Sequence, residues 1–395
     1  DARLVIMTAE ILHNMNLEEM TDIATVVMDE VHWVSDPDRG KVWEGTLLKL
    51  PQTVQVVLLS ATIDKPEKFA GWIEKVRDRK THAIATDYRV VPLKHFIIAA
   101  DNLHQTYEAK QPFDFDTFTR IKEDGYSSTH RLNKAVELLV RKNKAPVIFF
   151  CMSRKNCEKY ARQVRVVANT HEERREIEIM CFNLLKKYPE VRELAVYREL
   201  TELFNKGIAF HHSGMIPILK ELVEMIYKQG LIKVLFATET LAVGVNMPTR
   251  TVVFTQLEKP TERGRRTLTP AEFTQMAGRA GRRGHDKVGH VVFLPLDDRD
   301  LVTGAEYKDL LHGKAAPVRS QLQIDLQFVL GHLDKPNAMA RSMSFEQNQD
   351  RLNGLKIQLD RLNLKDSHQI SSNMEEYMRL DKQANPELGS MIRIS

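Results

Sequence analysis

The feature that most constrains the fold of this chain is a set of short apolar runs without clean polar alternation. Residues 23–28 (IATVVM) and 54–59 (VQVVLL) are the first two, and polar residues follow each of them. Runs of this kind are typical of parallel sheets, whose strands are buried on both faces. In open α/β sheets the ligand crevice lies beyond the carboxyl ends of the strands. We therefore expect chemistry at residues 29–30 and 60–62, where the two runs end.

A later stretch of the chain alternates strand and helix in the same way. It predicts strands at 147–150, 208–211, 233–237, 251–255 and 289–294. It also predicts helices at 135–141 and 216–229, two helices within the charge-rich stretch 155–204, and helices at 307–333 and 348–364. Residues 87–130 have no clear period, and we expect an insertion or connection there. Two alternating halves joined by a connection predict an α/β fold with a doubly wound pair of domains.

Composition excludes several classes of protein. The chain has 395 residues, 43% of them hydrophobic and 28% charged, which fits two globular domains or slightly more. No apolar run approaches the roughly 18 residues that span a bilayer. The three cysteines, at 151, 157 and 181, lack the paired spacing of a zinc site and predict buried thiols in an intracellular, reducing compartment. The net charge of +4 leans only weakly toward an anionic partner.

Two adjacent carboxylates, Asp29 and Glu30, follow the first apolar run. A strand that ends in this way has the form of a Walker B element. In that element the first carboxylate holds Mg²⁺ through water, and the second polarises the water that attacks the γ-phosphate. The dipeptide alone is a weak signal, because Asp-Glu after a strand is also common as a solvated turn.

The segment 275–284 (QMAGRAGRRG) strengthens the nucleotide hypothesis. A helix start is predicted at Thr269, and any helix that continues through the segment places Gln275, Arg279 and Arg282 on one face. Two guanidiniums beside a glycine turn suit the charge that develops on a transferred phosphoryl group. The alternative is a basic solvated face, which does not account for the interleaved glycines.

Five motifs stand in the order and rough spacing of a helicase of the second superfamily. They are DEVH at 29–32, SAT at 60–62, AFHHSG at 209–214, ATETLAVGVNMP at 237–248 and QMAGRAGRRG at 275–284. In detail the chain resembles the DEVH-box RNA helicases of the superkiller type, which feed RNA to the exosome. TAEILHNM at 8–15, DYRVVPLKH at 87–95 and the segment 310–330 look like further parts of that family, so the resemblance covers about residues 1–345.

The resemblance implies roles for individual residues in nucleotide chemistry. Asp29 and Glu30 would hold Mg²⁺ and activate water, and His32 would couple the nucleotide site to the rest of the cleft. Ser60 and Thr62 would link the state of ATP to domain motion. The second domain would complete the site with Gln275, Arg279 and Arg282, and with Gly244 and Asn246 nearby.

The resemblance also implies a track for RNA. The residues expected along the RNA backbone are Thr8, Glu10, His212, Ser213, Thr238 and Thr240. Contacts to phosphate and sugar position a strand without reading its sequence. Relatives carry a strand-parting β-hairpin where this chain has residues 256–268, and Gly264 would permit its turn.

The fold that the resemblance implies is α/β, with two RecA-like domains of parallel sheet, the first of them incomplete, and then the helical start of a winged-helix region. We expect the C-terminal part of the first RecA-like domain at 1–95 and an insertion or linker at 96–130. The second RecA-like domain is expected at 131–300 and the helical or winged-helix region at 301–395.

One departure from the family pattern concerns the phosphate-binding loop, G-x-x-x-x-G-K-[ST], which should precede the DEVH box. No such string occurs in the chain, and Gly40-Lys41 and Gly313-Lys314 lack both the upstream glycine and the following Ser or Thr. We therefore expect that this sequence begins after the loop, that the parent protein is an ATPase, and that the chain alone is not.

The function that follows from these expectations is ATP-dependent movement along single-stranded RNA, in the 3′ to 5′ direction, with unwinding of duplexes in RNA processing or decay. The expected cofactors are ATP and Mg²⁺, and the expected partners are single-stranded or tailed RNA and an exosome-type nuclease complex, with no membrane. Two alternatives stay open. One is a DNA helicase of the same superfamily that acts in repair, and the other is a non-catalytic, helicase-like scaffold that truly lacks the loop.

Overall fold

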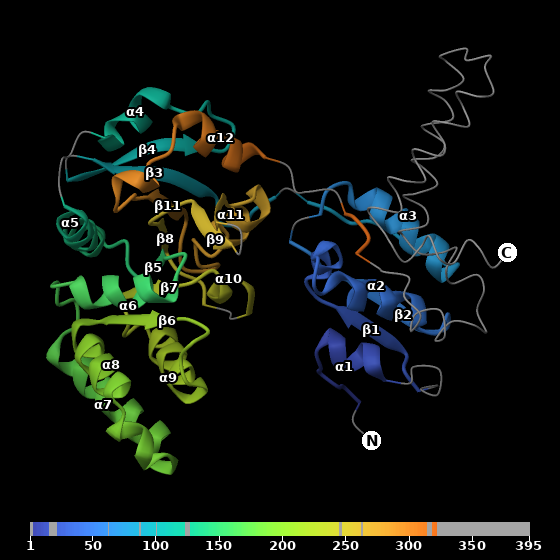
Figure 1. Cartoon of the computed structure of the whole chain (residues 1–395), viewed down its shortest axis with the longest axis horizontal. Coiled ribbons are helices and arrows are strands. Elements are labelled where there is room, and N and C mark those ends of the chain that lie inside the picture. Colours follow the sequence, from blue (N-terminus) through green and yellow to red (C-terminus); the bar gives the residue numbers. More distant parts are fainter. Residues whose placement is uncertain are drawn as a thin grey trace. The chain divides into compact units, whose positions relative to one another are not determined.

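The computed structural model describes residues 3–15, 22–61, 63–86, 88–99, 101–122, 127–244, 247–261, 264–313 and 318–321. The chain forms two compact units, one made of Asp1–Thr86 with Ala315–Ser395 and the other of Asp87–Lys314. Both are drawn in Figure 1. In the part of the chain that the structure describes, no helix is long and apolar enough to cross a membrane.

The first unit contains a two-stranded parallel sheet with helices around it. Its elements are α1 (Ala9–Asn14), β1 (Thr25–Met28), the 3-10 helix η1 (Val31–Ser35), α2 (Gly40–Lys49), β2 (Gln55–Leu58) and α3 (Pro66–Arg77). The two strands pair in parallel with Val26 opposite Val56, as predicted. Their expected burial on both faces is wrong for these residues, because Val26 is buried whereas the side chain of its neighbour Val27 is 59% exposed. Only one face of this sheet is covered.

The second unit is built on a seven-stranded sheet. Its strands are β3 (Leu93–Ala99), β4 (Asn102–Glu108), β5 (Val147–Phe150), β6 (Ile208–His211), β7 (Val234–Ala237), β8 (Thr251–Phe254) and β11 (Gly289–Phe293). Their order is β4-β3-β11-β8-β5-β7-β6, and every neighbouring pair is parallel except β3 with β4. Figure 1 shows this order from β4 at the top to β6 below. The five strands predicted in this region are confirmed, because all five belong to this sheet and nearly all of their residues are buried, including those of the edge strand β6.

Helices flank this sheet. They are α4 (Phe115–Thr119), α5 (Ser128–Arg141), α6 (Arg154–Gln163), α7 (His171–Leu184), α8 (Ala195–Lys206), α9 (Pro217–Lys228), α10 (Thr240–Gly244), α11 (Pro270–Ala277) and α12 (Gly304–His312). The stretch 155–204 holds three helices instead of the predicted two. The break after α6 has a local cause, because Asn169 donates to the carbonyls of Phe204 and Leu231, and Thr170 then caps α7.

The structure divides the chain differently from the predicted boundaries. Residues 93–108 form β3 and β4, which belong to the sheet of the second unit, and not a linker. The cause is apolar packing, since Ile97 and Phe118 are buried in the same core as Tyr307 of α12. Residues 304–312 therefore also belong to the second unit. The predicted helix 307–333 is correct only for residues 307–312, since residues 313 and 318–321 are not helical. Its other residues, and all of the predicted helix 348–364, lie outside the described residues.

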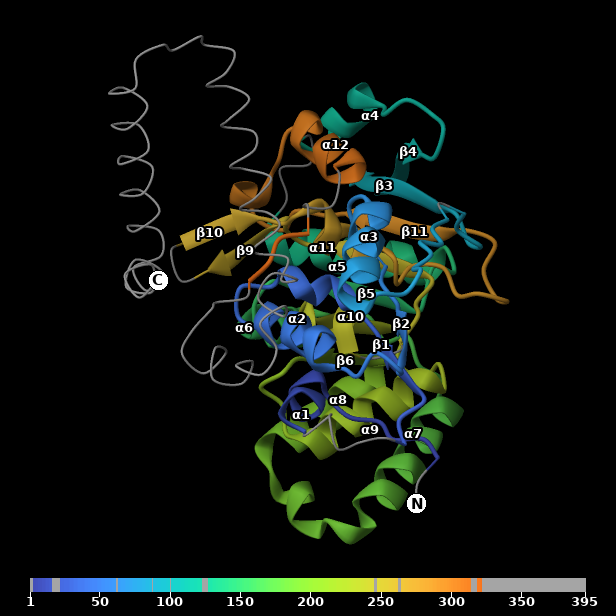
Figure 2. The same cartoon turned by 90° about the vertical axis from the view of Figure 1, so that its right-hand side faces the viewer.

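A two-stranded antiparallel hairpin, β9 (Glu258–Thr261) and β10 (Gly264–Thr267), lies between β8 and α11 in the chain. It confirms the hairpin predicted within 256–268. Gly264 has φ 126, a left-handed backbone that glycine adopts readily, at the point where the second strand begins. In Figure 2 the hairpin projects to the left, away from the strands of the seven-stranded sheet.

Candidate nucleotide and nucleic-acid sites

The carboxylates Asp29 and Glu30 lie directly beyond the end of β1. The Glu30 N–H donates to Asp29 Oδ1 at 2.9 Å, and Val31 N–H donates to the carbonyl of Leu59 at 2.9 Å, which ties the turn to the end of β2. Glu30 has φ 60, in the left-handed region. Non-glycine residues held in this conformation are concentrated at functional sites. The conformation of the turn is thus fixed by these two hydrogen bonds.

His32 and Ser60 lie beside this turn. His32 Nδ1 is 3.3 Å from Glu30 Oε2 and 3.4 Å from Ser60 Oγ. Burial lowers the pKa of His32, and the nearby carboxylates of Glu30 and Asp29 oppose that shift only in part. The imidazole is therefore neutral at pH 7. Its Nδ1 donates to Glu30 in one tautomer and accepts from the Ser60 hydroxyl in the other. Three of the predicted residues come together here, while Thr62 lies outside the described residues.

The pair of carboxylates fits a hydrated Mg²⁺. Asp29 is exposed and Glu30 is half-buried, so oxygens of both can face a ligand beyond the strand. Mg²⁺ keeps several waters in proteins and is commonly held by one or two carboxylates together with substrate phosphates. Asp29 uses one oxygen on the Glu30 N–H, which leaves its other oxygen for the hydration shell of the metal ion.

The predicted RNA contacts of the first unit, Thr8 and Glu10, lie at the start of α1. Thr8 caps the helix and accepts from the Ile11 N–H at 3.4 Å. Glu10 pairs with Arg39, whose Nε lies 3.0 Å from Glu10 Oε1, and backbone hydrogen bonding is the main cause that lowers the pKa of Glu10. An ionised Glu10 would repel phosphate, so it suits a ribose hydroxyl, whereas the exposed Thr8 hydroxyl suits either group.

In the second unit, four predicted RNA contacts meet at the carboxyl ends of the neighbouring strands β6 and β7. The Thr238 N–H donates to the carbonyl of His211 at 3.3 Å, and the hydroxyls of Thr238 and Thr240 are 2.9 Å apart. Ser213 and Thr240 are exposed. Hydroxyls at the ends of parallel strands are suited to contacts with phosphate and sugar.

His212 is part of this group but is buried. Its Nδ1 accepts from the Gly214 N–H at 3.2 Å, and its Nε2 lies 3.1 Å from Glu158 Oε1, so Nε2 carries the proton. Burial lowers the pKa of His212, with Glu158 opposing. The side chain orients the 212–214 turn, and contact with RNA falls to the exposed Ser213 next to it.

The structure corrects the predicted geometry of residues 275–284. The start at Thr269 is confirmed by a capping box with Glu272, but α11 ends at Ala277, with Gly278 as its C-cap. Arg279 and Arg282 therefore do not share a helical face with Gln275. Their loop turns at Gly281 (φ 86) and Gly284 (φ 81), so glycine and not helical spacing determines where these arginines point.

Arg279 and Gln275 have different surroundings. The Arg279 side chain donates to the carbonyl of Ala242 in α10, which places it beside the segment that ends at Gly244. Asn246 lies outside the described residues. Gln275 Nε2 is buried and has no hydrogen-bond partner within the described part of the chain. A buried amide donor without a partner fits a position that a ligand oxygen would occupy.

Arg282 is held in a buried ion pair. Its Nε lies 2.9 Å from Asp286 Oδ2, and Arg250 Nε lies 2.8 Å from Asp286 Oδ1. Burial would raise the pKa of Asp286, but hydrogen bonds from the two arginines hold it well below its usual range. Arg282 therefore has a structural role whether or not it also reaches a nucleotide.

Sequence reasoning missed Arg89, whose side chain binds the backbone of residues 278–284, called here the arginine loop. Its Nη2 donates to the carbonyls of Gly278 at 2.8 Å and Ala280 at 2.9 Å, one on each side of Arg279. Its Nε donates to the carbonyl of Val91. Arginine at 89 could not be singled out from the sequence, because its acceptors are backbone carbonyls almost two hundred residues away.

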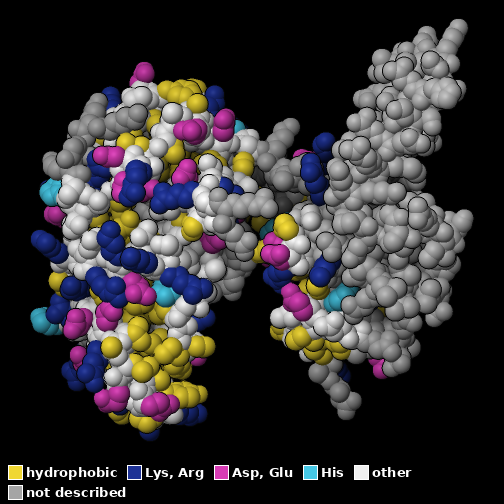
Figure 3. Space-filling view, viewed as in Figure 1, with side chains coloured by type: hydrophobic (Ala, Val, Ile, Leu, Met, Phe, Trp, Pro, Cys, Tyr) yellow, Lys and Arg dark blue, Asp and Glu magenta, His cyan; other side chains and the backbone are white. Residues whose placement is uncertain are grey.

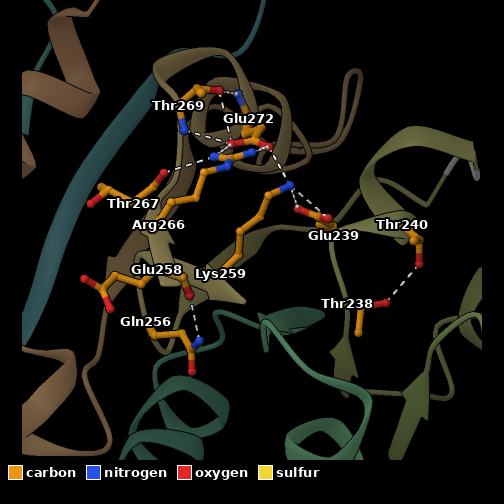
Figure 4. A network of polar contacts seen from close by, with 10 residues as sticks. All are labelled: Thr238, Glu239, Thr240, Gln256, Glu258, Lys259, Arg266, Thr267, Thr269 and Glu272. Carbon is orange, nitrogen blue, oxygen red and sulfur yellow. Dashed lines mark hydrogen bonds and ion pairs between the residues drawn. The ribbon is translucent and has the colours of Figure 1, made fainter. Parts of the chain in front are cut away.

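A network of charged side chains joins the hairpin to neighbouring segments, as Figure 4 shows. It joins Glu239, beside Thr238 and Thr240, to Lys259 of β9, and then to Glu272 of α11. Sequence reasoning missed these residues as well, because no pattern links charges that lie 13 and 20 positions apart along different elements.

Two family models match the chain. The one described as DEAD/DEAH box helicase matches residues 1–69, and the one described as helicase conserved C-terminal domain matches residues 173–284. The first range contains the Asp29, Glu30, His32 and Ser60 group, and the second contains the strand-end hydroxyls and the arginine loop.

Curated relatives give the same result over more of the chain. The exosome RNA helicase MTR4 of Mus musculus is 38% identical over 362 residues, which cover 84% of this chain and 34% of that protein. The uncharacterized helicase C17H9.02 of Schizosaccharomyces pombe is 34% identical over 417 residues, 95% of this chain and 40% of that protein. Superkiller complex protein 2 of Homo sapiens is 34% identical over 373 residues, which cover 84% of this chain and 29% of that protein. The chain thus spans between 29% and 40% of the length of these relatives.

Proposed function

This chain belongs to the DEAD/DEAH box helicase family, among the exosome and superkiller type of RNA helicases, and we propose that its full-length gene product is an ATP-dependent RNA helicase. The single observation that carries the proposal is the group of Glu30, His32 and Ser60 at the ends of two parallel strands. In that group His32 connects Glu30, a carboxylate able to activate water, to Ser60, which follows β2.

The first unit would supply the hydrolytic groups. Bound Mg²⁺–ATP brings the bond that is cleaved and the counter-charge for its phosphates. Asp29 orients the hydrated metal ion, and Glu30 orients the attacking water and accepts its proton. His32, neutral and within reach of both Glu30 and Ser60, passes a change at the carboxylate on to the segment after β2.

The second unit would supply charge stabilisation and RNA contacts. Arg279, held beside α10, is the better candidate for stabilising the transferred phosphoryl group, because Arg282 is already paired with Asp286. The exposed Ser213 and Thr240 offer hydroxyls to the RNA backbone, and the buried Thr238 orients Thr240 through the 2.9 Å contact of their hydroxyls. Figure 3 shows Lys and Arg spread among Asp and Glu over the visible face of this unit. The proposed binding rests on the polar groups at the strand ends.

Further parts of the proposal rest on the family resemblance. The substrate would be single-stranded or tailed RNA, the direction of travel 3′ to 5′, and the projecting hairpin 258–267 would part duplex strands. An exosome-type nuclease complex inside the cell would be the partner, as the names of the relatives suggest. These statements concern the whole protein.

The test compares two activators of ATP hydrolysis by the full-length gene product. Single-stranded RNA should raise kcat strongly, and single-stranded DNA of the same sequence should raise it much less. Arg279→Ala should reduce the RNA-stimulated rate by about 10³-fold or more while RNA affinity without nucleotide stays unchanged. Preferential stimulation by DNA would support the repair-helicase alternative. ATP hydrolysis that is absent in all conditions would support the non-catalytic scaffold.

A further inference from the structure

The hairpin β9–β10 has little apolar support of its own. All four residues of β10 are exposed, as are Pro260 and Thr261 of β9. Buried Leu257 and Leu268, joined by a 2.8 Å backbone hydrogen bond, anchor only its base. An isolated two-stranded hairpin is at best marginally stable in water. The direction in which this hairpin projects must therefore be fixed by polar contacts beyond the base.

Lys259 makes two of those contacts. Its Nζ lies 3.0 Å from Glu239 Oε2 and 2.6 Å from Glu272 Oε1, so one ammonium bridges two carboxylates from different elements (Figure 4). Arg266 of β10 supports the same Glu272 with two hydrogen bonds of 2.8 Å and 2.6 Å. A further pairing, Arg265 with Asp300, is longer at 3.7 Å.

The bridge is partly protected from water. The Lys259 side chain is 19% exposed and that of Glu272 is 24% exposed, whereas exposed surface pairs are worth little. Burial would raise the pKa of Glu272, but hydrogen bonds from Arg266 and Lys259 lower it to about 2. The carboxylate is thus charged at pH 7, and the bridge is an ion pair under that condition.

The two ends of the bridge lie in different functional segments. Glu239 stands between Thr238 and Thr240, and Thr240 is a proposed contact to the RNA backbone. Glu272 is in the first turn of α11, the helix that carries Gln275 and leads into Arg279. Among the described residues of the hairpin, Lys259 is the one that contacts both segments.

We propose that Lys259 is a positioning residue that holds the hairpin against both the RNA-contacting segment and α11, so that ATP turnover is converted into separation of duplex strands. The inference rests on the proposed helicase function and adds to it a specific determinant of coupling. Without the bridge, the hairpin would keep its anchored base and the Arg266–Glu272 contact but lose its link to Glu239 in the RNA-contacting segment. RNA-stimulated hydrolysis would then continue while strand separation declines.

The experiment measures, for the full-length gene product, duplexes separated per ATP hydrolysed on a 3′-tailed RNA duplex. Lys259→Met should lower this ratio by about five- to tenfold, a modest coupling effect, while kcat and KM for ATP with single-stranded RNA change less than about twofold. Lys259→Arg, which keeps a cation that can bridge two carboxylates, should restore most of the ratio.

Lys233→Met is the matched control. Lys233 Nζ lies 2.6 Å from Glu173 Oε1 with the Lys233 side chain 23% exposed, so the variant loses an ion pair of similar length and burial away from the hairpin. In Lys233→Met the number of duplexes separated per ATP hydrolysed should stay at the wild-type value. Glu239→Gln cuts the same bridge from the other side and should repeat the loss if Lys259→Met does not fold.

Two results would overturn the inference alone. The first is an unchanged ratio in Lys259→Met and Glu239→Gln when the wild type unwinds RNA. The second is a proportional loss of hydrolysis and strand separation, which would make Lys259 a general structural residue. A wild-type protein that hydrolyses ATP but never separates strands would instead refute the proposed function, and the inference with it.

Discussion

Replacing Arg282 with alanine should destabilise the second unit, whatever its effect on catalysis. Asp286, whose side chain is 3% exposed, accepts hydrogen bonds from Arg282 N, Nε and Nη2 and from Arg250 Nε. Alanine keeps the backbone N–H and leaves Arg250 in place, but it removes the two charged donors of the Arg282 side chain. The carboxylate then stays buried with half of its hydrogen bonds.

The expected loss of stability follows from the two hydrogen bonds that Asp286 loses. Removing one partner of a buried ion pair costs about 3–5 kcal/mol when the remaining charge has no other partner. Because Arg250 still compensates Asp286, we expect a smaller loss of about 2–3 kcal/mol in the free energy of unfolding. For a unit of this size each kcal/mol lowers Tm by about 2–4 °C, so Tm should fall by about 4–12 °C.

Thermal and urea unfolding of the 395-residue chain can measure this without any nucleotide. Arg283→Ala is the control, since Arg283 is an exposed neighbour and its loss should change stability by less than about 0.5 kcal/mol. An Arg282→Ala variant as stable as Arg283→Ala would refute the structural role assigned to the ion pair. Equal losses of RNA-stimulated ATP turnover at 279, 282 and 283 would reduce the whole segment to a basic patch.

Three further predictions concern the arginine loop and the core of the second unit. As a single substitution, Arg89→Met should lower RNA-stimulated kcat. Added to Arg279→Ala it should lower kcat no further, because Arg89 acts by holding the carbonyls on both sides of Arg279. Burial lowers the pKa of His95 to about 3, so the unfolded chain gains protons first and stability should fall between about pH 6.5 and pH 3, by at most about 1.4 kcal/mol per pH unit from this group. Urea unfolding at pH 7 and pH 5 should show a smaller difference in His95→Gln. Gly281→Ala should cost about 1–3 kcal/mol in urea unfolding, because its φ is 86 and an added Cβ would lie 2.5 Å from Val91 Cγ1.

The interior of the second unit could be predicted from the sequence because its strands are unbroken apolar runs. β5 and β6 are buried at every position, so their sequences contain little else. β4 was missed because an edge strand keeps polar residues on its open side, as the pattern of Asn102–Glu108 shows. Its neighbour β3, which lies between β4 and β11, was missed together with it. The opposite error occurred at β1, where an apolar run predicted two covered faces and the structure covers one.

The residues of the candidate sites likewise include some whose position could be predicted from the sequence and some whose position could not. Residues at the ends of neighbouring parallel strands could be predicted to lie together, because strand order alone brings Glu30 near Ser60 and Ser213 near Thr238. The direction of an arginine after a helix could not, because it depends on where Gly278 ends the helix and where Gly281 turns the chain. Pairings such as Glu239 with Lys259 depend on tertiary contact and leave no periodic trace in the sequence.

The most direct test of the helicase assignment compares Glu30→Gln with the wild type in the full-length gene product on a 3′-tailed RNA duplex. The wild type should separate the strands only with ATP and Mg²⁺. Glu30→Gln should bind ATP with similar Kd but hydrolyse it about 10²–10⁴-fold more slowly and separate no strands, because an amide cannot take the proton of the attacking water. Substantial hydrolysis by Glu30→Gln, or a wild type that separates no RNA strands with ATP, would contradict the account.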